Sequence, residues 1–176
     1  MKYTLETERL ILRPFNETDV NDMFNNWASD PEVVKYMTWN HHENIETTKT
    51  IINMWIEQYE KPERINFGIV LKETNELIGG IDVCGYIDGV PVIGYALSRK
   101  YCNNGYMTEA FLEVIKLLKS LGHNKIKIDA AQENIGSNKV IQKCGGKLIN
   151  TKIDYITNKQ QYFKINEYEI NINETN

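Results

Sequence analysis

The spacing of apolar residues predicts an opening strand followed by two amphipathic helices. A short apolar run that ends in a proline predicts a strand over residues 9–14. Apolar residues then recur at steps of three and four, which predicts one helix that ends at Ser29-Asp30-Pro31 and a second that Asn44 caps and Pro62 ends. The apolar stripe of the first helix is Val20, Met23, Phe24 and Trp27, and that of the second is Ile45, Ile51, Ile52, Trp55, Ile56 and Tyr59.

The middle of the chain changes to the short runs that are typical of a sheet. Three such runs, over residues 66–71, 77–84 and 92–97, are separated by the turn sequences Thr74-Asn75 and Asp88-Gly89. Apolar and polar residues alternate poorly in these runs, so we expect both faces of the sheet to be covered.

The clearest helix of the chain is predicted over residues 107–121. Its apolar residues recur at helical spacing, and a glycine follows as a C-terminal cap. A strand over residues 125–131, a short helix over 137–144 and two strands over 147–156 and 160–170 complete the pattern. The helical stripe consists of Met107, Ala110, Phe111, Val114, Ile115, Leu118 and Leu121.

These elements predict an α+β (mixed α/β) fold, with about seven strands and helices on both faces of the sheet. Neither internal repeats nor a low-complexity linker divide the chain, so we expect residues 1–176 to form a single domain.

Composition excludes several classes of function. The net charge is −4 and basic residues form no stripe, which argues against a nucleic-acid partner. No apolar run approaches the roughly 20 residues of a membrane span, and the N-terminal residues lack a secretory pattern, so we expect a cytoplasmic protein. The three cysteines are widely spaced and form no C-x-x-C pair, so we expect neither disulfides nor a metal site.

The segment that links the strand at residues 92–97 to the long helix carries the first chemical signal. Its loop reads Asn103-Asn104-Gly105, and the first turn of the following helix has backbone N–H groups without a partner inside the helix. Such amides, together with the helix dipole, bind anions such as a pyrophosphate, and Arg99 just upstream adds positive charge. A plain turn and helix cap explain this segment equally well.

A second segment decides between these readings. After the strand at residues 125–131 the chain reads Asn134-Ile-Gly-Ser137 and then Lys-Cys-Gly-Gly, and here it resembles the GNAT superfamily of N-acetyltransferases. The similarity is to the branch of Rim-type enzymes, which acetylate the N-termini of ribosomal proteins. It covers nearly the whole chain, since the opening Leu-Glu-Thr-Glu-Arg-Leu-Ile-Leu-Arg-Pro and the stretch Gly-Tyr-Met-Thr-Glu-Ala also match.

This resemblance implies a mostly antiparallel sheet, acetyl-CoA as the acyl donor and a role for each matching residue. The backbone near Leu97 should bind the pantetheine arm as if the arm were an added strand. Asn134 should bind the same arm through its side-chain amide, and Ser137 should lie near the thioester sulfur and act as general acid. The amides that should wrap the pyrophosphate are those of Asn103, Asn104, Gly105, Tyr106, Met107 and Thr108.

The chain departs from the superfamily pattern at three positions. The phosphate loop begins with Cys102 rather than Arg or Gln, and it ends with Met107 rather than a small residue. Backbone amides make the contacts, so we expect phosphate binding to survive. Many members place a tyrosine general acid where this chain has Ile141, which leaves Ser137 as the candidate.

The amine should attack the thioester directly, with much of the rate coming from orientation. A backbone N–H near Leu97 is the candidate to stabilise the tetrahedral oxygen. The candidates for the general base are Asp82, Glu133, His41 and His42, and we take Asp82 as the first. Cys102 and Cys144 have no histidine placed to activate them, so no acyl-enzyme is expected.

Two acceptor classes stay open at this point. One is a small amine, such as a polyamine or an aminoglycoside or streptothricin antibiotic, and the other is a protein N-terminus. The alternative function is a CoA-binding sensor that has lost catalysis, which the missing tyrosine at Ile141 keeps open. The oligomeric state, monomer or homodimer, is also left open.

Overall fold

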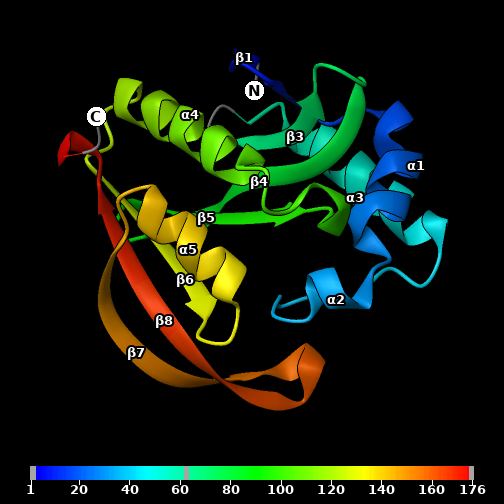
Figure 1. The fold of residues 1–176 in the computed structure, drawn as a ribbon. Helices are drawn as coiled ribbons and strands as arrows, with labels where there is room; N and C mark the ends of the chain where they lie inside the picture. The colour runs from blue at the N-terminus through cyan, green and yellow to red at the C-terminus, as the bar shows by residue number, and fades with distance from the viewer. Residues whose placement is uncertain (1–2, 62–63, 175–176) are drawn as a thin grey trace.

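The strands form one sheet that runs through the molecule (Figure 1). The computed structural model describes residues 3–61 and 64–174. In this part of the chain eight strands lie in the order β1-β2-β3-β4-β5-β6-β8-β7. Neighbours are antiparallel except β5 and β6, which are parallel. The strands are β1 Leu5–Glu6, β2 Leu10–Arg13, β3 Asn66–Leu71, β4 Glu76–Ile87, β5 Val90–Leu97, β6 Lys125–Ala131, β7 Lys147–Ile156 and β8 Gln161–Asn171.

Helices cover both faces of this sheet. Apolar residues of α4 and α5 pack on one face, around the fully buried Phe111 and Ile141. Apolar residues of α1 and α3 pack on the opposite face, around Met23 and Ile52, and the π-turn after α1 adds Trp27. The α-helices are α1 Val20–Met23, α2 Pro31–Val34, α3 Ile45–Gln58, α4 Tyr106–Ser120 and α5 Ile135–Lys143, and short 3₁₀ turns span Glu17–Asp19, Arg99–Tyr101, Thr157–Lys159 and Ile172–Glu174.

The predicted fold class is confirmed, with one strand more than expected. The additional strand β1 has only two residues, too few for an alternating pattern to reveal it, and it pairs with β2. All six residues of β3 are buried, as expected for a strand that is covered on both faces. The helix α3 ends at Gln58, and Pro62, predicted to end it, lies outside the described residues.

The first predicted helix is not a single regular helix. It opens as a 3₁₀ turn that Asn16 caps, continues as α1, and widens into a π-turn over Phe24–Ala28. Both the amide and the hydroxyl of Ser29 donate to the carbonyl of Phe24, at 3.2 and 2.6 Å, which closes the wider turn. This widening leaves Trp27 buried beside the sheet. A pattern of apolar spacing does not distinguish the α-helix from its tighter and wider forms.

The parallel strands β5 and β6 pair at one position only, Val92 with Lys127. We call the space between their ends, residues 93–97 and 128–131, the wedge. On its other side β5 pairs with β4 throughout, and the amide of Ser98 donates to the carbonyl of Ile78 at 2.9 Å. Hydrogen bonds to one neighbour alternate along an antiparallel strand. The amides and carbonyls of Tyr95 and Leu97 therefore face the wedge.

Candidate active site

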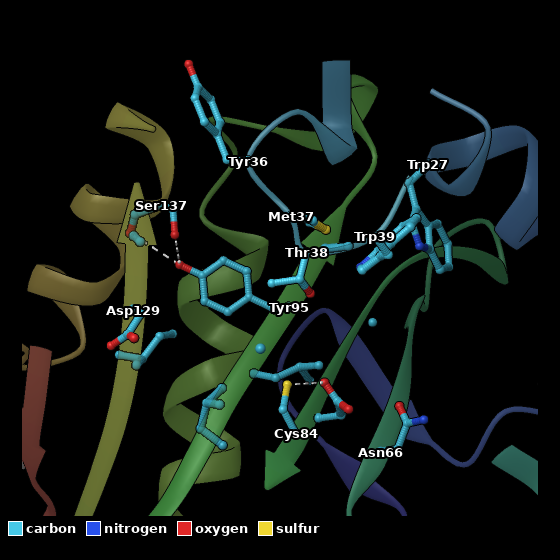
Figure 2. Close-up of a pocket in the computed structure, with 18 of the residues that line it drawn as sticks. Trp27, Tyr36, Met37, Thr38, Trp39, Asn66, Cys84, Tyr95, Asp129 and Ser137 are labelled. Atoms are coloured by element: carbon cyan, nitrogen blue, oxygen red, sulfur yellow. Dashed lines mark hydrogen bonds between the residues drawn. The ribbon is translucent and has the colours of Figure 1, made fainter. Parts of the chain in front are cut away.

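A cavity of about 580 Å³ occupies the wedge (Figure 2). Residues 94–96 of β5 and 128–131 of β6 line its sides. Side chains from the α1–α3 face, among them Trp27 and Trp39, form one wall. Ser137 at the first turn of α5 approaches from the other face. The cavity therefore connects the two faces of the sheet.

The loop before α4 has the geometry of an anion site. Gly105 is the N-cap residue of α4 with a φ of +81°, a conformation that glycine adopts without strain. The first bond of the helical ladder runs from the amide of Glu109 to the carbonyl of Gly105 at 3.0 Å. The amides of Tyr106, Met107 and Thr108 precede this ladder, and no side chain caps them. These residues fit a pyrophosphate, and its binding at this loop stays a prediction.

Arg9, which the sequence-based reading did not single out, holds this loop in place. Its Nη1 donates to the carbonyl of Asn104 at 3.0 Å, and its Nε donates to Glu109 at 2.7 Å. The guanidinium also lies 4.4 Å from the ring centroid of Tyr106. These contacts join the N-terminal strands to the start of α4. The signal for Arg9 in the sequence is the Thr-Glu-Arg segment at residues 7–9, which belongs to the stretch that resembles the family.

Arg99 and Lys100 are the two cations beside this loop, and each of them lies next to a carboxylate. The Nε of Arg99 donates to Asp30 at 2.7 Å, and Lys100 lies 3.5 Å from Glu76. Each positive charge is therefore already paired with a carboxylate, and a phosphate contact by Arg99 stays a prediction. The Asn104 side chain stays local, since its Nδ2 donates to the carbonyl of Cys102 at 3.0 Å. Asn103 has a φ of +66°, which helps to turn the loop.

Ser137 forms a hydroxyl pair with Tyr95. The two side-chain oxygens lie 3.0 Å apart, and the Tyr95 hydroxyl also lies 3.2 Å from the Ser137 carbonyl (Figure 2). Burial raises the pKa of Tyr95 above its usual value, so the phenol keeps its proton at neutral pH. The position of the expected tyrosine is filled by Ile141, which is fully buried in the core. Tyr95 thus brings a phenol to Ser137 from β5 instead.

Two asparagines fix Ser137 and the start of α5. Asn134 is the N-cap residue, and its Oδ1 accepts the amide of Ser137 at 3.1 Å, which leaves its Nδ2 group for a ligand. Buried Asn138 donates to the carbonyl of Ala131 at 2.8 Å and accepts from the Tyr168 hydroxyl at 2.7 Å. These bonds tie α5 to β6 and β8, so they set the position of Ser137 relative to the wedge.

Asp82 lines the cavity on β4, beside Cys84 and Arg64. The Cys84 thiol donates to its Oδ1 at 3.3 Å, and the Arg64 Nη1 lies 3.6 Å from its Oδ2. Burial raises the pKa of Asp82, although Cys84 and Arg64 act in the opposite direction. On the facing strand a Cβ at Gly94 would lie 2.5 Å from the Cys84 sulfur and 3.5 Å from Asp82, so the glycine leaves room for both.

The other candidate bases differ in their environments. His42 is buried at the cavity, its Nδ1 lies 2.7 Å from the Thr48 hydroxyl, and burial lowers its pKa, so it is neutral near pH 7. His41 and Glu133 are exposed and do not line the cavity. Asp129 on β6 also lines the cavity, and burial raises its pKa. The sequence pattern did not indicate Asp129 as a candidate. Within residues 3–61 and 64–174, no group of three or more His, Cys, Asp or Glu residues is arranged to hold a metal ion.

Comparison with known proteins identifies the family of this chain. Residues 9–147 match the family model described as the acetyltransferase (GNAT) domain. The chain belongs to the GNAT acetyltransferase family. The predicted family and the enzyme class, an acyl-CoA-dependent N-acetyltransferase, are therefore confirmed. None of the helices in the described part of this GNAT protein is long and apolar enough to cross a membrane.

Relatives of this GNAT chain match it over most of its length. An uncharacterised N-acetyltransferase of Bacillus licheniformis, p20, is 33% identical over 141 residues, which cover 78% of this chain and 79% of p20. A solved GNAT acetyltransferase from Bacillus anthracis is 26% identical with a TM-score of 0.84, and the match covers 98% of this chain and 100% of that one.

The ribosomal L7/L12 alpha-N-protein acetyltransferase RimL has the same fold. Its structure in complex with coenzyme A has a TM-score of 0.84 at 17% identity, and the match covers 96% of this chain and 98% of RimL. The Rim-type enzymes to which the sequence is similar thus share this architecture. Nothing in these relatives favours a CoA-binding module without catalysis.

Proposed function

We propose that this protein transfers an acetyl group from acetyl-CoA directly to a primary amine, with Asp82 as general base and Ser137 as general acid. The observation that carries this proposal is the cavity through the wedge. It places Asp82 on the face of α1–α3 and Ser137 on the face of α4 and α5. A thioester held between β5 and β6 is then open to an amine on one face and to a proton donor on the other.

The residues present suit acetyl-CoA as the donor. The partnerless amides at Tyr106 to Thr108 suit the pyrophosphate, and the free edge of β5 at Tyr95 and Leu97 suits the amide groups of the pantetheine arm. The Nδ2 group of Asn134 is a further donor to that arm. Binding of CoA by RimL supports this placement.

The reaction then requires two proton transfers. The neutral amine attacks the thioester carbonyl, and its proton passes to the Asp82 carboxylate, directly or through one water. An N–H of Tyr95 or Leu97 in the wedge stabilises the tetrahedral oxygen. The C–S bond breaks, and the thiolate takes the proton of the Ser137 hydroxyl. Water then returns a proton to Ser137 and takes the proton from Asp82, which restores both groups. The Tyr95 hydroxyl lies 3.0 Å from Ser137 Oγ, and when it donates to that oxygen it orients the serine hydrogen toward the sulfur and offsets the developing charge.

We further propose that the enzyme acts in the cytoplasm, where acetyl-CoA is available. All three cysteines are free, and the exposed Cys84 and Cys102 suit a reducing compartment.

Calorimetric titration with acetyl-CoA tests the donor, with free CoA and ATP as controls. Micromolar binding of acetyl-CoA and much weaker binding of ATP are expected, because ATP offers phosphates but no pantetheine arm for β5. An amine panel read by thiol release then tests the transfer. A protein that binds no acetyl-CoA, or that binds ATP equally well, would contradict the proposed donor site.

A further inference from the structure

Building on the proposed function, we infer the class of acceptor. It is a small cationic amine with an apolar or aromatic body and an oxygen within a few bonds of its nitrogen, which Asn66 recognises. Four features of the cavity carry this inference: its charge, its wall, its closed side and a buried amide without a partner.

The charge of the cavity favours a cation. Asp82, Asp129 and Asp154 line it, and among the described residues no lysine or arginine does. Two cations lie beside this lining: Arg64 is 3.6 Å from Asp82, and Lys152 is 3.7 Å from Asp154 but bonds more closely to Glu167, at 2.9 Å. An ammonium group is therefore attracted into the cavity, and the amine attacks after it has lost its first proton to water.

The wall on the α1–α3 face is apolar and aromatic. Trp27, Trp39 and Trp55 line it together with Phe15, and the Phe15 and Trp55 rings pack at 4.9 Å. Figure 2 shows Trp27 and Trp39 among the residues that line the cavity. Such a surface binds the flat or apolar part of a ligand and offers few hydrogen-bond partners to a polar chain. The body of the acceptor is therefore apolar, while its amine end is polar.

The β7–β8 hairpin closes the cavity on one side. The Asn158 Nδ2 at its tip donates to the carbonyl of Thr38 at 2.6 Å, and Lys159 Nζ donates to the carbonyl of Trp39 at 2.8 Å. Tyr36 and Phe163 add an edge-on ring contact. A cavity of about 580 Å³ that also receives the acetyl group suits a small ligand. An extended peptide needs an open groove, which these contacts obstruct.

Asn66 supplies the specific contact. Its side chain lies at the cavity with 2% of the residue exposed, and its Nδ2 has no hydrogen-bond partner. Because a buried donor without a partner is costly, a partner supplied by the ligand gives a physical reason for this group. Asn66 and Asp82 are directly opposite each other on β3 and β4. A ligand that places its amine at Asp82 therefore places a nearby hydroxyl or carbonyl oxygen at Asn66.

Thiol release measured with three acceptors tests this inference. The first is 2-amino-1-phenylethanol, the second is its deoxy analogue 2-phenylethylamine, and the third is a hexapeptide with a free N-terminus. We expect kcat/KM to be about tenfold higher for the amino alcohol than for the deoxy amine, as one hydrogen bond to a buried donor implies. Both small amines should exceed the peptide.

The variant Asn66→Leu has a side chain of similar size without the amide, and Asn66→Ala is the second variant. Both should remove the preference for the amino alcohol, so that the rate with the amino alcohol falls about tenfold more than the rate with 2-phenylethylamine, while the KM for acetyl-CoA stays unchanged. A merely structural role of Asn66 would lower both amine rates together, and that result would overturn the inference. A preference that persists in both variants would overturn it too.

Failure of the inference is distinguishable from failure of the proposed function. If acetyl-CoA binds and the peptide is acetylated faster than either small amine, the acceptor class is wrong while the acetyltransferase stands. If acetyl-CoA binds and neither these three acceptors nor any amine of the wider panel releases thiol, both are contradicted. The expected result is binding of acetyl-CoA with release of thiol that is fastest for the amino alcohol.

Discussion

Replacing Tyr95 by phenylalanine isolates the contribution of the hydroxyl pair. The substitution keeps the ring, which packs 5.9 Å from Phe111, and removes the oxygen that lies 3.0 Å from Ser137 Oγ. Loss of one buried hydrogen bond costs about 1 kcal/mol of unfolding free energy. For a chain of 176 residues this corresponds to a fall in Tm of roughly 2–4 °C. The variant should therefore be folded under assay conditions.

The Tyr95→Phe substitution should affect kcat much more than it affects the free energy of unfolding. A positioned proton donor contributes about 10²–10⁴-fold to a rate. Tyr95 acts through Ser137 rather than on the sulfur itself, so we expect kcat of Tyr95→Phe to fall by about 10–100-fold, which is at or below the lower limit of that range. The KM for acetyl-CoA should stay within about twofold, because the backbone contacts of β5 are unchanged.

The decisive assay is a double-mutant cycle measured by single-turnover thiol release, which separates chemistry from product release. Tyr95→Phe, Ser137→Ala and the double variant are compared at saturating acetyl-CoA. Groups that act as one unit are not additive, so the double variant should be no slower than Ser137→Ala. Rate losses that multiply, or a Tyr95→Phe variant that keeps the full single-turnover rate, would refute the hydroxyl pair. Full turnover in Ser137→Ala would refute the general acid itself.

Two further predictions concern the loop and the base. Thr108→Glu should weaken acetyl-CoA binding at least about tenfold in calorimetry, because it adds a negative charge where the pyrophosphate should bind. The similarly sized Thr108→Gln should not weaken binding. Equal affinities of these two variants for acetyl-CoA would contradict the loop assignment. Asp82 works as a base only when ionised, and burial raises its pKa, so kcat should fall on acidification at a pH above the ordinary carboxyl value of about 4. Asp82→Asn should remove this limb and lower kcat by about 10²-fold; a limb that persists there and vanishes in His42→Asn would assign the base to His42.

Much of the fold could be predicted because its signals are local. The stripe from Met107 to Leu118 repeats within one helix, and Gly105 and Gly122 mark its ends by their own conformations. The strand Asn66–Leu71 has the predicted bounds, because it is bordered by turn and loop residues. The conformation of the loop before α4 was predictable for the same reason, since any helix start provides backbone amides without a partner inside the helix.

The missed site residues all depend on contacts between distant parts of the chain. Tyr95 and Ser137 are 42 residues apart, and Arg9 and Glu109 are 100 apart. In the sequence Tyr95 is one more aromatic residue of a strand, and its role arises only when α5 packs beside the wedge. Asn66 is equally inconspicuous as the first residue of β3, because its significance lies in having no partner once it is buried.

The wedge lies between two halves of the site. One half should bind the acyl donor, and the other should bind the acceptor amine. On the face of α4 and α5 the donor should be held largely by main-chain groups, at the loop and along β5, which tolerate side-chain changes such as Cys102 and Met107. On the face of α1–α3 the acceptor should meet side chains only, from Asn66 and Asp82 to the tryptophans. Substitutions on that second face can therefore alter the acceptor while leaving the affinity for acetyl-CoA intact. A shared fold at 17% identity is thus compatible with different acceptors, so the likeness to RimL need not extend to the amine.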